Sequence, residues 1–227
     1  MDILFSQYGL DYLVRWGHLL FGIVWIGLLY YFNFVQTEYF KEAEADHRSG
    51  AIQKLVPRAL WWFRWGAAFT FLTGLYLLYR LQMGMTYDIL VGATLGTLMA
   101  INVWFVIWPN QKIVIASATQ VAGGGEALPE AAAAAPKAGL ASRTNTLFSI
   151  PMLFFMGSSA HLKSEKTATI MANDLITPES LIAVFVIILA LQLNALRGKQ
   201  GPMTSVVGVI HCGLGLTAVL YGCMHLL

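Results

Sequence analysis

Long apolar stretches dominate this chain. A stretch of about 20 mostly apolar residues has the length of a helix that crosses a bilayer. Six such stretches are present, at residues 12–35, 59–80, 88–108, 141–162, 178–196 and 203–226. The sequence therefore predicts an all-α fold, a polytopic integral membrane bundle of about six transmembrane helices, with residues 1–227 forming a single membrane domain.

The charged residues are too few to cover a water-facing surface. Only 11% of the residues are charged and 57% are hydrophobic, whereas a soluble domain carries roughly 25% charged residues. The net charge of +2 comes without a run of basic residues, so we expect no nucleic-acid partner. Asp2 and Asp11 stand where a signal peptide would be basic, so we expect the first apolar stretch to be retained.

Basic residues are unevenly divided between the two sets of loops. Residues 113–140 form the longest connector, expected to be flexible or partly helical because of its glycine and alanine runs. By the positive-inside rule the basic loops face the cytoplasm. This places both termini on the periplasmic side of a bacterial inner membrane. The loops after the first, third and fifth stretches hold Lys41, Arg48, Lys54, Arg58, Lys112, Lys137, Arg143, Arg197 and Lys199, against Arg80, Lys163 and Lys166 on the other side.

Histidines in membrane helices are costly unless they are paired or bound to a metal, so they are candidates for function. Four of the five histidines lie in the predicted helices: His18, His161, His211 and His225. The alternative for each one is a histidine that only hydrogen bonds to a neighbouring helix. The predicted topology brings His18, His161 and His225 to the outer side, which favours one outer haem b with two of these three as axial ligands.

A stripe of small residues accompanies the histidines of the last helix. Spacings of three and four place six residues on one face. Such a face could serve close helix packing alone, but it also leaves space for a flat macrocycle. His211 lies about 21 Å from His225 along the helix, so a second haem would need His47, Met152 or Met99 as its other ligand. No C-x-x-C-H motif exists to attach a haem covalently. The stripe consists of Gly208, His211, Gly215, Ala218, Gly222 and His225.

Other polar residues are expensive in a membrane and are candidates for substrate binding. Arg64 lies in the run Trp61-Trp62-Phe63-Arg64-Trp65, where it could snorkel or could bind an anion or a haem propionate. Arg143 could likewise snorkel near its helix end. The remaining residues of this kind are Arg15, Asn33, Asn102, Asn145 and Asn194.

Several short motifs, taken in order over most of residues 12–162, resemble the membrane domain of the bacterial membrane-bound urate hydroxylases. The most specific is Pro109-Asn110-Gln111-Lys112, which follows a helix carrying Asn102-Val103. The others are Arg15-Trp16-Gly17-His18, Ile23 to Gly27, Trp61 to Trp65, Gly96 to Val103, and Asn145 to Met156 with His161.

This resemblance implies a haem-linked membrane oxidase that hydroxylates urate with water as the oxygen source and passes electrons to cytochrome c. A planar purine anion would be held by Arg64 or Arg143, with Asn102 and Asn145 orienting its amide edges. The chain departs from the family pattern at three places. It has Arg64 and Gly66 where the family is expected to have lysine and glutamate, Arg143-Thr144 where a histidine is expected, and a short first loop.

Three functions remain open from the sequence. The first is a cytochrome-c-linked urate oxidase; because the chain stops at Leu227, we expect the family's cytochrome c domain to be missing and a separate cytochrome c or neighbouring redox subunit to accept the electrons. The second is a non-catalytic haem or scaffold subunit of a larger respiratory or oxidase complex. The third is a helix bundle without a cofactor, in which the histidines only link helices.

Overall fold

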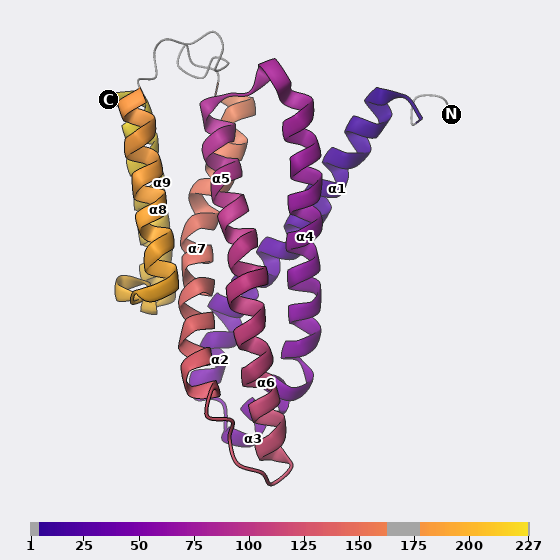
Figure 1. Ribbon diagram of the computed structural model, residues 1–227, viewed down its shortest axis with the longest axis vertical. Coiled ribbons are helices and arrows are strands. Elements are labelled where there is room, and N and C mark those ends of the chain that lie inside the picture. The colour runs from indigo at the N-terminus through magenta and orange to yellow at the C-terminus, as the bar shows by residue number, and fades with distance from the viewer. Residues whose placement is uncertain (1–4, 163–177, 227) are drawn as a thin grey trace.

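The computed structural model describes residues 5–162 and 178–226, and this part of the chain forms seven continuous helices (Figure 1). Lys163 and Lys166, two of the three basic residues expected on the outer side, lie outside the described residues. The elements in order are α1 (Gln7–Tyr30), η1 (Tyr31–Gln36), α2 (Thr37–Glu42), α3 (Ala45–Lys54), α4 (Val56–Leu81), η2 (Gln82–Gly84), α5 (Tyr87–Ile101), η3 (Asn102–Ile107), α6 (Trp108–Ala122), α7 (Ala131–His161), α8 (Pro178–Arg197), η6 (Gly201–Thr204) and α9 (Val206–Leu226).

Four of these helices, not six, are long and apolar enough to cross a membrane: Gln7–Glu42, Tyr87–Ala122, Glu179–Arg197 and Val206–His225. The two expected spans that fail this test are α4 and α7, which run beside the others along the long axis (Figure 1). Composition, not length, sets them apart. Helix α4 contains Arg58, Arg64 and Arg80, and the middle of α7 contains several buried polar residues, which lower the mean hydropathy of both helices.

Two of the long helices continue further than the sequence predicts, through short π-helical segments. In η1 and η3 the helix widens by one residue and then resumes as α2 and α6. The stretch expected at residues 88–108 continues past Pro109, which lies in the first turn of α6. A proline ring clashes with the carbonyl four residues earlier in an α-helix, and the preceding π segment changes that pairing. Within the connector expected at residues 113–140, the first ten residues end α6 and the last ten begin α7, so its non-helical part is residues 123–130.

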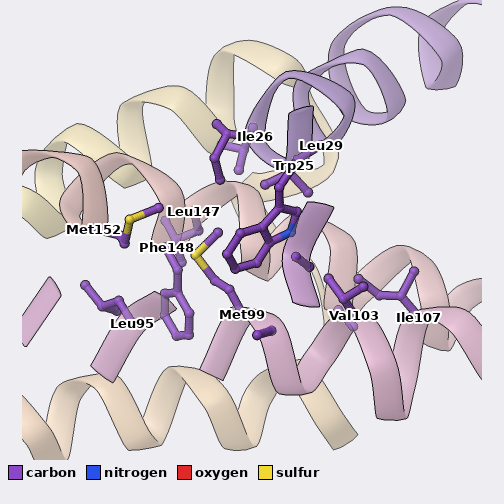
Figure 2. Packing of buried hydrophobic residues seen from close by; sticks show 14 of the residues in the cluster. Trp25, Ile26, Leu29, Leu95, Met99, Val103, Ile107, Leu147, Phe148 and Met152 are labelled. Atoms are coloured by element: carbon purple, nitrogen blue, oxygen red, sulfur yellow. The ribbon is translucent and has the colours of Figure 1, made fainter. Parts of the chain in front are cut away.

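The core lies where α1, α5 and α7 meet. Figure 2 shows Trp25 of α1 extending toward Met99 of α5, with Phe148 and Met152 of α7 beside them. Helix α1 also approaches α4 closely at Gly66, where an added Cβ would come within 3.1 Å of the Trp25 backbone nitrogen. Because α7 has neighbours on all sides, its central residues 140–149 are buried with the exception of half-buried Ser142.

The outer faces of the apolar helices expose large hydrophobic side chains. On α8 these recur at three- and four-residue spacing and form one outward stripe: Ile182, Val186, Leu189 and Leu193. A continuous exposed apolar stripe is costly in water and favourable in lipid. The fold therefore agrees with a helical membrane protein, in which the polar residues are turned inward toward α7.

Candidate functional site

Polar side chains gather in the middle of α7, which is the centre of the bundle. Thr144, Thr146 and Ser149 satisfy their hydroxyls on carbonyls of their own helix, at Leu140, Ser142 and Thr146. Such back-bonding is how hydroxyls are tolerated inside a helix. Arg143 and Asn145 instead interact with other helices. Asn145 bonds to Asn102 of η3, and Arg143 lines a cavity together with residues of η1.

Asn102 and Asn145 meet in a buried cluster of three amides. The Asn102 amide nitrogen donates to Asn145 Oδ1 at 2.9 Å and to Gln192 Oε1 at 3.0 Å, and Gln192 Nε2 donates back to Asn102 Oδ1 at 2.7 Å. Asn145 Nδ2 donates to the Met99 carbonyl at 2.9 Å. The structure thus brings together two of the expected substrate residues. Their hydrogen-bonding groups are already occupied by the protein, which favours a structural role.

The other π segment, η1, also bonds to α7 through a buried asparagine. Asn33 of η1 donates to the Leu29 carbonyl at 2.9 Å and to Ser142 Oγ at 2.8 Å. One turn earlier, the Tyr30 hydroxyl lies 2.9 Å from Ser149 Oγ. Each π segment therefore contributes one buried asparagine that bonds to α7. This agrees with the frequent occurrence of π segments at functional positions of helices.

Arg143 is the most exceptional residue of the centre, because it is a guanidinium with only 3% of its surface exposed. Its closest carboxylate oxygen is Glu38 Oε1, at 3.8 Å from Nη2, which is beyond hydrogen-bond length. Nη1 is buried without a hydrogen-bond partner. The Glu38 carboxylate is held instead by Lys41, whose Nζ lies 2.8 Å from both oxygens.

A cavity of about 270 Å³ opens beside Arg143. The π segment η1, α2, α4, α6 and α7 all contribute to its wall, and Gln36, Asn33 and Gln111 are among its polar lining residues. Gln36 Oε1 is buried without a hydrogen-bond partner. The sequence analysis missed Gln36, Glu38 and Gln192, since a single polar residue within or next to an apolar stretch carries no signal of its own.

Arg64 lies apart from this cavity, in a cage of tryptophans. Its guanidinium carbon is 4.0 Å from the Trp108 ring centroid, 5.9 Å from that of Trp104 and 6.0 Å from that of Trp65. These are cation–π distances. Arg64 and Arg143, the two cationic substrate-residue candidates, therefore occupy different places, and only Arg143 lines the cavity.

His18 is held between α1 and α4. Its Nδ1 lies 3.0 Å from Thr73 Oγ1, while the Thr73 hydroxyl proton is directed to the Phe69 and Thr70 carbonyls, at 2.6 and 3.0 Å. Thr73 must then accept from His18, so Nδ1 carries the proton and Nε2 keeps its lone pair. The ring packs on Gly74, where an added Cβ would lie 3.2 Å from Cε1. Metal-ligating histidines are commonly oriented by such a donated bond.

The other expected ligands lie on α7 and α9. Contacts of Gly213 with Ile150 and of Tyr221 with Phe154 show that these helices run side by side, and they bring the exposed His161 and the half-buried His225 to neighbouring ends. Around them lie Asp88 of α5, which accepts from Ser158 Oγ at 3.0 Å, and the Tyr221 ring, 4.2 Å from that of His225.

The small-residue stripe of α9 is turned away from the bundle core. His211, Gly215 and Ala218 are exposed, and His211 Nδ1 lies 2.8 Å from the Val207 carbonyl of its own helix. His47 is exposed on α3, and Met99 and Met152 are core residues, so none of the three faces His211 as a second ligand. Among the described residues, His211 therefore has none of the three second ligands that the sequence offered for it.

A haem fits the described residues in part. His18 has an anchored ring, and His161 and His225 share one end of the bundle, yet neither the Arg143 cavity nor the apolar groove between α4 and α5 has a histidine in its described lining. Within residues 5–162 and 178–226, no three His, Cys, Asp or Glu side chains are grouped to hold a metal ion.

The fold and this centre define a class: over the described residues, an all-helical protein with four potential membrane spans, built around a helix with a polar middle whose buried Arg143 has its nearest carboxylate oxygen at 3.8 Å. Residues 81–189, just under half of the chain, match the family model described as urate oxidase N-terminal, which confirms the resemblance predicted from the sequence. This segment runs from the end of α4 into α8 and contains Asn102, Arg143, Asn145 and His161. No curated protein and no solved structure matches the chain significantly.

Proposed function

We propose that this chain is a membrane oxidoreductase of the urate oxidase type, which binds one haem b and passes electrons to cytochrome c. The observation that carries the proposal is the family match, because the matched residues include the buried arginine and the polar centre of α7. Hydroxylation of urate with water as the oxygen source releases electrons and protons in equal number. The electrons need an acceptor, which the haem would supply when bound.

The chain's own residues would divide the work between the two ends of the bundle. Arg143 would bind the substrate anion, since its Nη1 has no hydrogen-bond partner. His18, whose Nδ1 bonds to Thr73, and the pair His161 and His225 are the candidate haem ligands. A cytochrome c or a neighbouring redox subunit would dock at the end of the bundle where the described N- and C-terminal segments lie (Figure 1). By the positive-inside rule this end is periplasmic.

Haem content and urate-dependent reduction test this function directly. The protein purified from its native membrane should give a pyridine haemochrome spectrum of haem b, and urate should reduce added cytochrome c in its presence. Replacing His18, His161 and His225 singly by alanine should bleach the spectrum in at least two of the variants. His47→Ala, on exposed α3, is the matched control and should leave it unchanged. A protein without haem that reduces no cytochrome c would refute the proposal.

A second function is favoured by the occupied amides. Because Asn102 and Asn145 already bond to Gln192 and Met99, they are poorly placed to orient a purine, as a catalytic role would require. The alternative is a non-catalytic haem or scaffold subunit of a larger membrane complex. A purified protein that contains haem but shows no urate-dependent reduction of cytochrome c would establish this alternative.

A further inference from the structure

The cavity beside Arg143 has both apolar and polar lining residues. Phe32 and Phe63 are among the apolar ones and meet edge to face, with ring centroids 5.4 Å apart. Arg143 and Gln36 are among the polar ones. The volume of about 270 Å³ is near the lower end of the range of ligand sites, roughly 300–1,000 Å³. The cavity therefore suits a molecule of one or two small rings, and a haem or a lipid chain is too large for it.

The charge of Arg143 is only partly balanced by the protein, through Glu38 at 3.8 Å. A buried guanidinium is stable only with a close anion and satisfied donors, and Arg143 has its nearest carboxylate oxygen at 3.8 Å and no partner for Nη1. Lys41 already holds both oxygens of that carboxylate, Glu38. A ligand anion would supply the missing partner.

The ligand must also donate a hydrogen bond. Gln36 lines the same cavity, and its Oε1 is a buried acceptor without a hydrogen-bond partner. A simple inorganic anion with no N–H or O–H group would leave it unsatisfied, at a cost in affinity. A flat heterocyclic anion that carries ring N–H groups beside its carbonyl oxygens satisfies both Arg143 and Gln36.

We propose that this cavity is the binding site for a small planar monoanion of the cyclic amide class, held by Arg143 and Gln36 and entered from the end of the bundle that carries α2 and α3. The identification of that anion with urate rests on the proposed function. Lys41 and Thr204 are exposed residues of the lining, so the cavity reaches the surface at this end. Glu38 competes with the ligand for Arg143, so it limits affinity and disfavours a second negative charge.

The site lies far from the expected haem ligands. Arg143 and His161 are 18 residues apart on α7, which is about 27 Å at the helical rise. Ligand binding can therefore be measured without any redox step, and its failure can be separated from a failure of haem binding or catalysis.

Equilibrium titration of the purified full chain with urate, in detergent and without an electron acceptor, tests the site. Arg143→Gln should raise the Kd about 10- to 100-fold, since a charge-assisted bond is lost. Arg143→Lys should retain part of the affinity. Glu38→Gln should lower the Kd about threefold, because it removes the competing carboxylate. Arg58→Gln removes an equal charge from an exposed position at the same end and should change nothing.

The outcomes separate the two proposals. Urate binding that is equal in the wild type and in Arg143→Lys and Glu38→Gln would overturn the site and leave the urate function intact. If urate does not bind but another cyclic amide anion, such as deprotonated barbiturate, binds and depends on Arg143, the site stands and the urate function fails. If neither anion binds to the folded wild type, the site is overturned. If the Arg143 variants do not fold, the Kd of Glu38→Gln alone decides the test: an unchanged Kd overturns the site.

Discussion

Asn102 is the residue through which the π segment η3 bonds to both α7 and α8. Its side chain is fully buried and takes part in three amide hydrogen bonds, to Asn145 and to Gln192. In a membrane interior, interhelical hydrogen bonds are individually modest, yet a donor or acceptor left without a partner is costly. The cluster thus fixes how α8 sits on the bundle.

Removing one amide of this cluster should therefore lower the free energy of unfolding more than removing two of them. Asn102→Leu should destabilise the protein by about 1–2 kcal/mol, seen as a fall of about 2–8 °C in Tm. Asn102→Leu with Gln192→Leu should recover part of that loss, because the abandoned Gln192 amide is removed as well. Strictly additive losses in the double variant would contradict this account. Asn110→Ala, which removes a bond to its own helix at Val106, is the control and should change Tm less.

At the scale of elements, the π segments decide which side chains reach α7. A π segment holds one residue more than the α-helix on either side of it, so it turns the following residues without breaking the helix. In η1 this brings Asn33 to α7 and Gln36 to the cavity wall. No hydropathy pattern reports such an insertion, since both segments are as apolar as their surroundings.

Deletion of one residue should be tolerated inside a π segment and not outside it. Val35 of η1 is 56% exposed and Ile23 of α1 is 71% exposed, so neither deletion removes much packing. Deleting Val35 should convert η1 to a regular α turn and retain the register of α1. Deleting Ile23 should rotate one side of α1 by about 100° relative to the other and disrupt its contact with α4. Size-exclusion profiles and melting curves that are equal for the two would show that η1 has no such role.

At the scale of the whole molecule, the basic residues mark one end of the bundle. The α2–α3 and α6–α7 connections lie at the end opposite to the described N- and C-terminal segments (Figure 1). Helices α2 and α3 carry Lys41, Arg48 and Lys54 at this end. Four helices suit a membrane by length and composition, and α4 and α7 run alongside them. Together with the positive-inside rule, this arrangement predicts that the Arg143 cavity lies near the cytoplasmic surface.

Reporter fusions should show this orientation. A fusion after Gly50, in α3, should report the cytoplasm, and a fusion after Leu227 should report the periplasm, because the two lie at opposite ends of the bundle. A fusion after Gly84, between α4 and α5, serves as the internal control and should agree with Leu227. The same compartment for Gly50 and Leu227 would contradict an arrangement in which the two ends of the bundle lie on opposite sides of the membrane.

The sequence by itself determined the fold class and the positions of the helices, because hydropathy and helix length are local properties of a segment. It also identified Arg143 as a candidate, since an arginine at an apolar stretch is costly to bury whatever the tertiary structure. It overcounted the membrane spans, because α7 has the length of a span but is buried among neighbours and can carry polar residues.

Only the tertiary structure decided which polar groups meet. Gln192 is 90 positions from Asn102, and Glu38 and Gln36 are more than 100 positions from Arg143, so no spacing along the chain relates them. Arg64 and Arg143 were equivalent candidates in the sequence, yet packing enclosed one among tryptophan rings and left the other beside an open cavity. The physical reason is that burial and partners are set by segments brought together in folding, whereas a sequence pattern reports only its own segment.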